Sequence, residues 1–130
     1  MSAINEAVEA VIGLTQNVPT FARVTRGAMT TGNCITCEIG PSSPSEVYLD
    51  KDAYLPLRIV INAKHTDLWV LSESLNAVHK ALTTAREYPA GNDWHIVDIS
   101  NSVMPQIIGR ETDNRWFMSS ALTVNLYLGE

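Results

Sequence analysis

The sequence predicts an α+β fold, in which a mixed, mostly antiparallel sheet is packed by an N-terminal helix and one long central helix. The chain has 130 residues, of which 45% are hydrophobic, and this suits a single domain, residues 1–130, with one core. Apolar residues recur at helical spacing in two stretches and alternate at strand spacing in several others. The strands mostly follow one another through short turns, which favours antiparallel pairing with the helices on one side.

The first helix is predicted over residues 3–16, where apolar residues recur at helical spacing. Ser2 is suited to the N-cap position, and Glu6 places a negative charge in the first turns. Pro19 ends the pattern because a proline disfavours a helical conformation in the residue before it. Residues 20–32 are mixed and end in a turn signal.

Three strands are predicted between the two helices. The first covers residues 34–40 and is followed by a Pro/Ser-rich loop at about 40–46, which we expect to be mobile, and a short strand at 46–49. The strongest strand of the chain covers residues 55–63 and begins near a proline, where the missing N–H costs least. The apolar face of this strand carries Leu57, Ile59 and Ile61.

The long central helix is predicted from about Asp67 to Ala85. Thr66 or Asp67 can accept hydrogen bonds from the free N–H groups of its first turn. The stretch EYPAGND then breaks the helix. The side chains that repeat at spacings of three and four, and so predict a stripe facing the core, are Leu68, Leu71, Leu75, Val78 and Leu82.

The C-terminal third predicts a strand at 94–100 and then a hairpin with a short first arm around Ile107 and Ile108. Simple alternation places Trp94, Ile96 and Asp98 on one face of the first strand and His95, Val97 and Ile99 on the other. The second arm of the hairpin, residues 116–128, has 13 residues, whereas strands usually have about 5–6. Such a strand is either central in the sheet or partly used between subunits.

The charge balance argues against nucleic-acid binding as the main role. The net charge is -5, and the basic residues form no cluster that could neutralise phosphates. No apolar run approaches the roughly 20 residues needed to cross a bilayer. The N-terminus carries acidic and no basic residues, so it is unlike a signal peptide, and we expect folding in a reducing cytoplasm.

Lys64, His65 and Asp67 stand close together in the sequence and are the candidates for catalysis. Catalysis requires a nucleophile, a base and an orienting group within hydrogen-bond reach. A strand places Lys64 and His65 on opposite faces, and Asp67 falls at the start of a helix. We therefore favour a structural turn over a small enzyme or ligand-binding domain that uses these residues.

Cysteine and histidine spacing gives little support for a metal or redox site. Cys34 and Cys37 form a CxxC pair, but a zinc site needs about four ligands and no second pair exists. In a strand the two sulfurs diverge, so we expect one buried and one half-exposed thiol. His79 is expected at the boundary of the core stripe, and no spacing ties it to His65 or His95.

Trp69, Trp94 and Trp116 are interpreted as core residues or interface anchors rather than ligand-stacking groups. The stretch RETDNRWF, residues 110–117, places two arginines, two acids and an aromatic pair around a turn. Arg and Trp dominate protein–protein hot spots, so this hairpin is either a contact element or a solvated turn.

Taken in order, the strand YLPLRIVINAKHTD, the helix LWVLSESLNAVHKAL, the strand WHIVDIS, the stretch MPQIIGRETDNRWF and the strand SSALTVNLYL resemble a phage family. They are similar to the tail terminator proteins, or minor capsid proteins, of long-tailed bacteriophages and phage-tail-like particles. The resemblance covers about residues 50–130, and the N-terminal helix fits in position. It lies in the order and spacing of elements, and no single motif is diagnostic.

The resemblance implies a non-enzymatic protein without a cofactor that assembles as a homohexameric ring on the tail tube. The ring stops tube polymerisation and offers a docking surface to the head–tail connector protein, while DNA passes through the lumen without specific binding. It implies a place in the virion, at the head–tail junction, after assembly in the host cytoplasm. Another head–tail joining or tail-completion protein is the alternative. The residues predicted for contacts with other copies or partners are Arg110, Glu111, Asp113, Arg115, Trp116, Phe117, Tyr48 and Tyr54.

Overall fold

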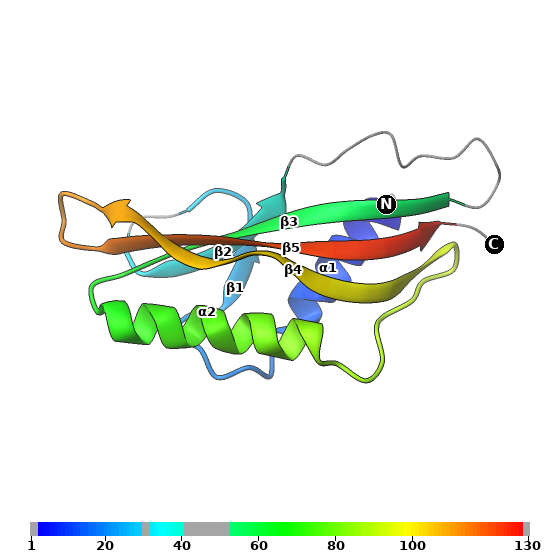
Figure 1. Cartoon of the computed structure of the whole chain (residues 1–130), viewed down its shortest axis with the longest axis horizontal. Helices are drawn as coiled ribbons and strands as arrows, with labels where there is room; N and C mark the ends of the chain where they lie inside the picture. Colours follow the sequence, from blue (N-terminus) through cyan, green and yellow to red (C-terminus); the bar gives the residue numbers. More distant parts are fainter. Residues whose placement is uncertain (1–2, 30–31, 41–52, 129–130) are drawn as a thin grey trace.

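The structure is a computed structural model that describes residues 3–29, 32–40 and 53–128. Two predicted segments lie outside these ranges: the loop at about 40–46, except for its first residue, and the strand at 46–49. The helices and strands of the described residues (Figure 1) are α1 Ala3–Leu14, β1 Val24–Arg26, β2 Cys34–Ile39, β3 Ala53–His65, α2 Leu68–Thr83, β4 Trp94–Arg110 and β5 Trp116–Leu128.

The strands form one five-stranded sheet in the order β1-β2-β3-β5-β4. β1 runs parallel to β2, and each of the other neighbouring pairs is antiparallel. The predicted α+β class with a mixed, mostly antiparallel sheet is therefore confirmed.

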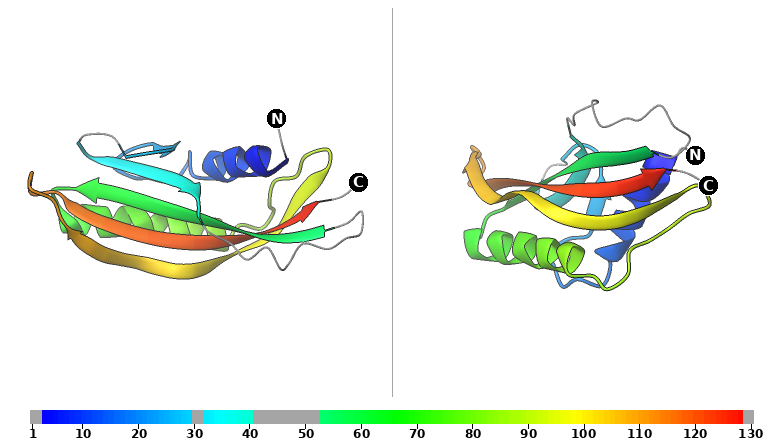
Figure 2. Two further views of the ribbon diagram at one scale, coloured as in Figure 1. Left: turned by 90° about the horizontal axis from the view of Figure 1, so that it is seen from above. Right: turned by 45° about the vertical axis from the view of Figure 1, so that its right-hand side comes forward.

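One hydrophobic core joins the helices to the sheet. α2 runs along one face of the sheet (Figures 1 and 2), and α1 closes the core near Trp94, whose Nε1 donates to Glu6 Oε1 at 3.4 Å. Burying each large aliphatic side chain contributes roughly 1.5–3 kcal/mol. The fully buried side chains at the centre of this core include Val8, Ile35, Ile59, Ile61, Leu71, Leu75, Leu122 and Leu126.

The long C-terminal strand is confirmed as β5, and it is central in the sheet. It pairs with β3 on one side and with β4 on the other. The β3–β5 ladder runs from Ala53–Leu128 to His65–Trp116 without a register shift. The interpretation that placed this strand inside the sheet is therefore correct.

The sequence predicted a strand at 94–100 and a separate short hairpin arm near residue 107. This prediction is wrong, because the structure joins both segments in the single 17-residue strand β4. Its register against β5 shifts between Ile96 and Asp98 and at three further places. Each shift inserts an unpaired residue and lets the strand follow the curved sheet. Polar and proline residues that break the sequence pattern are thus absorbed as irregularities within one strand.

The first shift also overturns the predicted faces of this strand. Because Val97 is the inserted residue, Asp98 pairs with Asn125 on the outer face, and Ile99 pairs with Val124 over the core. Ile99 is consequently buried. Simple alternation fails here because one extra residue reverses the direction of the side chains that follow, up to the next register shift.

The observed ends of the other helices and strands differ less from the predicted ends. α1 ends at Leu14 rather than at residue 16, and the side chain of Thr15 donates back to Ile12 O at 2.6 Å. β3 extends two residues beyond the prediction at each end. The sequence also gives no signal for the three-residue strand β1, which lies in the stretch interpreted as mixed.

Candidate interaction surfaces

The turn from β3 into α2 is built by Asp67 and His65. Asp67 has an extended backbone, and its Oδ1 accepts from Trp69 N at 2.9 Å and from Val70 N at 3.3 Å. The Nδ1 atom of His65 accepts from the backbone N–H of Asp67 at 2.8 Å. The ring of His65 also packs edge-on against Phe21, with centroids 4.6 Å apart. The capping role predicted for this turn is confirmed for Asp67.

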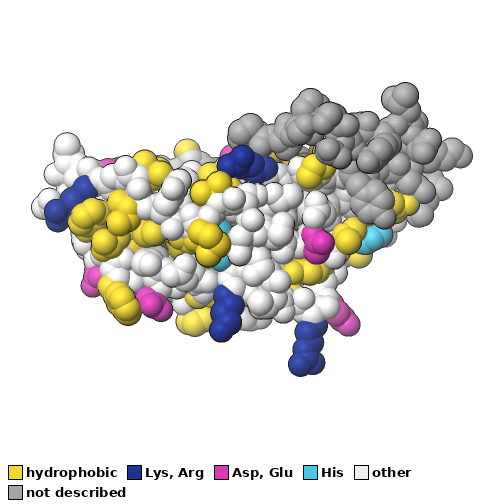
Figure 3. Space-filling view, viewed as in Figure 1, with side chains coloured by type: hydrophobic (Ala, Val, Ile, Leu, Met, Phe, Trp, Pro, Cys, Tyr) yellow, Lys and Arg dark blue, Asp and Glu magenta, His cyan; other side chains and the backbone are white. Residues whose placement is uncertain are grey.

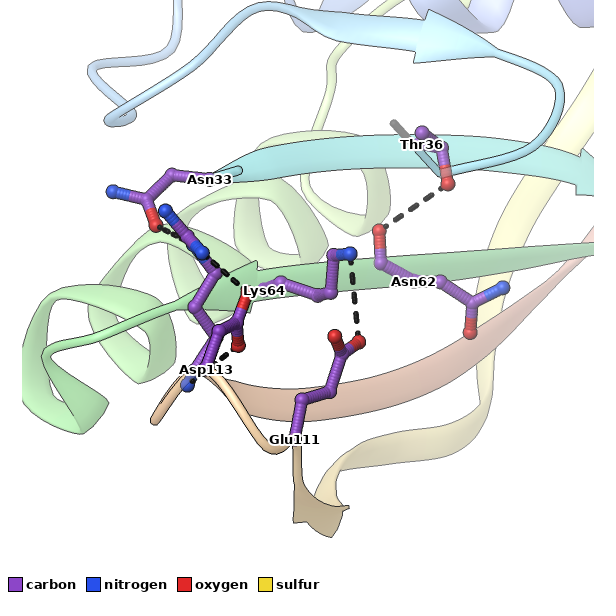
Figure 4. A network of polar contacts seen from close by, with 7 residues as sticks. Asn33, Thr36, Asn62, Lys64, Glu111 and Asp113 are labelled. Atoms are coloured by element: carbon purple, nitrogen blue, oxygen red, sulfur yellow. Dashed lines mark hydrogen bonds and ion pairs between the residues drawn. The ribbon is translucent and has the colours of Figure 1, made fainter. Parts of the chain in front are cut away.

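Lys64 takes no part in that turn. Its side chain is buried on the opposite face of β3, and its Nζ lies 3.4 Å from Glu111 Oε1 (Figure 4). Asn62, two residues earlier on the same face, accepts from Ser119 Oγ at 2.8 Å. The structure therefore does not bring Lys64 together with His65 and Asp67, and each of the three has a structural partner.

The β4–β5 connection is a tight turn closed by two backbone hydrogen bonds. Glu111 N donates to Arg115 O at 2.8 Å, and Asn114 N donates to Glu111 O at 3.0 Å. Asn114 has φ 68°, in the left-handed region that asparagine tolerates better than most residues. This combination is the usual geometry of a three-residue hairpin loop.

Charged groups of the predicted interface are held by contacts within the chain. Arg115 donates through Nε to Asn33 Oδ1 at 2.9 Å and pairs with Asp113 (Figure 4). The guanidinium carbon of Arg110 lies 4.9 Å from the ring centroid of Trp116, in cation–π geometry. These contacts order the hairpin before any partner binds.

The structure brings most of the predicted interface residues to this one hairpin. Arg110 and Asp113 are exposed, whereas Glu111, Arg115, Trp116 and Phe117 are half-buried. Tyr54 lies in β3 opposite Tyr127, far along the ladder from the hairpin turn. Tyr48 lies outside the described residues.

His79 is buried, which corrects the expectation that it lies at the core boundary. It is 2% exposed, and its Nδ1 and Nε2 atoms lie 2.7 Å from Asn101 Oδ1 and Ser120 Oγ, respectively. Because the Asn101 oxygen only accepts, Nδ1 carries the proton and Nε2 accepts from the serine hydroxyl. Burial lowers the pKa of His79, and the hydrogen bond that Nδ1–H donates to Asn101 opposes this with a smaller upward effect, so the ring is neutral at pH 7.

Both cysteines are buried, so the expected half-exposed thiol is wrong. Cys37 belongs to the core between sheet and helices, and Cys34 is buried on the other face of β2. Burial, with a smaller contribution from Glu38, raises the pKa of Cys37 to about 11. This thiol therefore stays protonated, which disfavours a redox role.

The three histidines are held in separate places. His95 lies against Tyr127 with centroids 4.9 Å apart, well away from the pairs made by His65 and His79. Across the part of the chain that the structure describes, no group of three metal-ligating side chains comes together. In the same residues, no helix is long and apolar enough to span a membrane.

Exposed apolar side chains concentrate on β4 and at the start of α2. Within the described residues, the exposed large hydrophobic side chains are Trp69, Val97, Met104, Ile107 and Ile108. Trp69 is the most exposed, at 73%. Figure 3 shows hydrophobic side chains gathered at the end of the molecule where the β4–β5 turn and the start of α2 lie.

Two hollows flank Trp69. One, of about 360 Å³, separates it from Ile107 and is floored by Leu68 and Met118. The other, of about 560 Å³, lies on the opposite side of Trp69, toward Phe21. The sequence predicts Trp69 as a core residue or interface anchor, whereas Met104 is not among the predicted contact residues. The apolar residues on either side of Pro105 were the available signal.

Comparison with known proteins places the fold among solved structures. No protein-family description and no curated protein matches the sequence. A chain from the "Virion of native gene transfer agent (GTA) particle" matches with a TM-score of 0.55 at 13% identity, over 96% of this chain and 92% of that chain. At this identity the likeness shows a shared fold.

Two structures from Akkermansia muciniphila also match, each at 15% identity and over 98% of this chain. Their TM-scores are 0.37 and 0.35, and the match spans 50% and 54% of their own lengths. These likenesses are too weak to support an argument.

Proposed function

We propose that this chain is a structural protein of a phage-like particle and acts there as a ring-forming tail terminator. The observation that carries the proposal is the fold shared with a gene transfer agent virion chain over nearly the full length of both chains. In this role it caps the tail tube, stops tube polymerisation and presents the docking surface for the head connector. Its proposed site is the head–tail junction of the virion, reached after assembly in the host cytoplasm.

The proposed partners are other copies of the chain, in a ring of six, together with the tail tube protein and the head–tail connector protein. The ordered hairpin around Arg110 and Trp116 supports a contact role, since preorganised groups lose less entropy on binding. The net charge of -5 suits a lumen through which DNA passes without sticking.

We infer a non-enzymatic role without a cofactor. The residues that were candidates for chemistry have structural partners: Asp67 caps α2, His65 accepts from the Asp67 backbone, and Lys64 pairs with Glu111. Replacing His65 with alanine is expected to reduce stability and leave assembly intact. Loss of an activity with folding and assembly unchanged would favour the enzyme alternative.

Electron microscopy of the purified protein, alone and mixed with tail tubes, tests the proposal. We expect rings or caps on tube ends, and tubes of limited length when the protein is present during polymerisation. A concentration series is needed because weak interfaces form by mass action. Monomers at every concentration, with no association with tubes, would contradict the proposal.

The second candidate is another head–tail joining or tail-completion protein. The virion match names a whole particle rather than a position within it, which keeps this candidate open. Pull-down against tail tube protein and connector protein separately distinguishes the two. Binding to the connector without binding to the tube would favour the second candidate.

A further inference from the structure

We propose that neighbouring copies join head to tail, with an apolar ridge on β4 of one copy seated in a hollow beside α2 of the next. The ridge consists of Met104, Ile107 and Ile108. The hollow is the larger of the two that flank Trp69, and its walls include Phe21 and Glu73. This inference rests on the proposed ring-forming function and assigns the two surfaces that would build the ring.

The ridge is suited to contact through side chains rather than through added strands. Met104, Ile107 and Ile108 are 56%, 52% and 56% exposed on a strand that forms one edge of the sheet. Register shifts at both ends of this segment, and Pro105 within it, interrupt the row of backbone groups that another strand would pair with. The exposed apolar groups therefore call for a covering surface of a different kind.

The hollow is preformed and has an apolar character. Its volume is about 560 Å³, and the residues that line it are Pro19, Thr20, Phe21, Trp69, Val70, Glu73, Ser74 and Ala77. The backbone N–H of Phe21 donates to Ser74 Oγ at 3.4 Å, and the Phe21 ring packs on His65. These contacts tie the loop that forms one wall to the helix that forms the other.

The two surfaces lie on different flanks of α2. β4 is one edge of the sheet, whereas residues 19–21 lead into β1, which is the opposite edge. Two different surfaces at different places on one chain produce a head-to-tail contact when one binds the other, and this contact closes a ring when the rotation per copy allows it. A two-fold symmetric dimer in which the ridge of one copy packs on the ridge of the other would leave the hollow of each copy empty.

Charge and area support a second copy as the occupant. Arg110 is exposed two residues beyond Ile108, and Glu73 is exposed on the wall of the hollow, so a head-to-tail contact brings opposite charges together. The ridge alone exposes on the order of 300 Å² of mainly apolar surface, a little over a third of the roughly 800 Å² that each partner contributes to a standard interface, and Trp69 adds apolar area on the facing side, in the hollow.

Disulfide trapping between two single variants tests the geometry. Ala77→Cys lies in the hollow and Ile108→Cys on the ridge. An equimolar mixture is expected to give cross-linked dimers under mild oxidation, and neither variant alone is expected to do so. Thr84→Cys, exposed just after the far end of α2, replaces Ala77→Cys in the matched control mixture, which should stay uncross-linked. Dimers in Ile108→Cys alone, or equal yields in both mixtures, would overturn the head-to-tail arrangement.

Charge reversal supplies an independent readout that needs no oxidation. Arg110→Glu and Glu73→Arg are each expected to weaken self-association about tenfold in sedimentation measurements, and the double variant should recover most of the loss. Thermal unfolding of each variant checks that the fold is kept. This inference is overturned if Arg110→Glu and Glu73→Arg each form normal rings and the mixture of Ala77→Cys with Ile108→Cys gives no cross-link. That result leaves the tail terminator proposal standing. A wild-type chain that neither self-associates nor binds tubes overturns both.

Discussion

The central strand pair β3–β5 and the edge strand β4 belong to one sheet but differ in regularity and burial. β3 and β5 each have 13 residues and pair along their whole length without a shift. β4 has 17 residues and four register shifts, and its second half carries Met104, Ile107 and Ile108 in exposed positions. The apolar side chains of the central pair hold the fold, whereas those at the end of β4 contribute little to it.

This difference separates two uses of hydrophobic residues in one small protein. A side chain buried on folding stabilises the monomer, while an exposed apolar side chain gains its stabilisation only when another surface covers it. The buried polar group His79 lies where the two regions meet, because its partners come from β4 and β5. Substitutions in the two regions should therefore differ sharply in their effect on the free energy of unfolding.

The largest effect is expected for Leu122→Ala in β5. Leu122 is fully buried at the centre of the core, so removing its side chain should lower the unfolding free energy by about 3–5 kcal/mol. Ile108→Ala on β4 is the matched control and should change it by less than about 0.5 kcal/mol. Chemical denaturation of dilute, monomeric protein measures both. Similar losses in the two variants would remove the contrast between centre and edge.

An intermediate effect is expected for His79→Ala. The substitution leaves Ser120 without its buried partner and opens a cavity beneath β4, so a loss of about 2–3 kcal/mol follows. Hydrogen exchange should show that the β4 amides lose more protection than those of the β3–β5 ladder. Uniform loss along all three strands would mean that His79 does not join the edge to the centre in particular.

The pH dependence of stability gives a second measure of the same site. Burial lowers the pKa of His79 below its ordinary value of 6.5, so between these two values the unfolded chain binds a proton that the folded protein does not. The share of stability due to His79 is therefore complete above about pH 6.5 and declines as the pH falls toward the folded pKa. The His79→Gln variant should show a shallower decline over that interval. Parallel curves for the two proteins would contradict this.

The smallest effect is expected for Glu111→Gln, which breaks the pair with Lys64. The Lys64 side chain is buried, but Glu111 is 36% exposed and water screens the pair, so we expect a loss of about 1 kcal/mol. Glu87→Gln, at an exposed site just after α2, serves as the control for removing a carboxylate. An unchanged midpoint in Glu111→Gln would mean that the hairpin does not depend on this contact with β3.

Local sequence patterns predicted the elements whose periodicity is uninterrupted. α2 spans Leu68–Thr83 with Asp67 as its cap, within two residues of the predicted bounds, and β5 spans Trp116–Leu128 as predicted. β4 could not be predicted in the same way because its inserted residues break the alternation. The hairpin residues of the candidate site were visible as an unusual cluster of Arg, Trp and acids. The hydrogen bond that Asn33 accepts from Arg115 could not be predicted, because the two residues are 82 positions apart along the chain.

The sequence by itself determined the two helices, the strands β2, β3 and β5 and the cap of the long helix, because each depends on neighbours within a few positions. Only the tertiary structure decided that β4 is a single irregular edge strand, that His79 is buried between Asn101 and Ser120, and that Trp69 stands between two hollows. These features depend on which distant segments lie side by side, and register between strands is set by cross-strand packing rather than by local spacing.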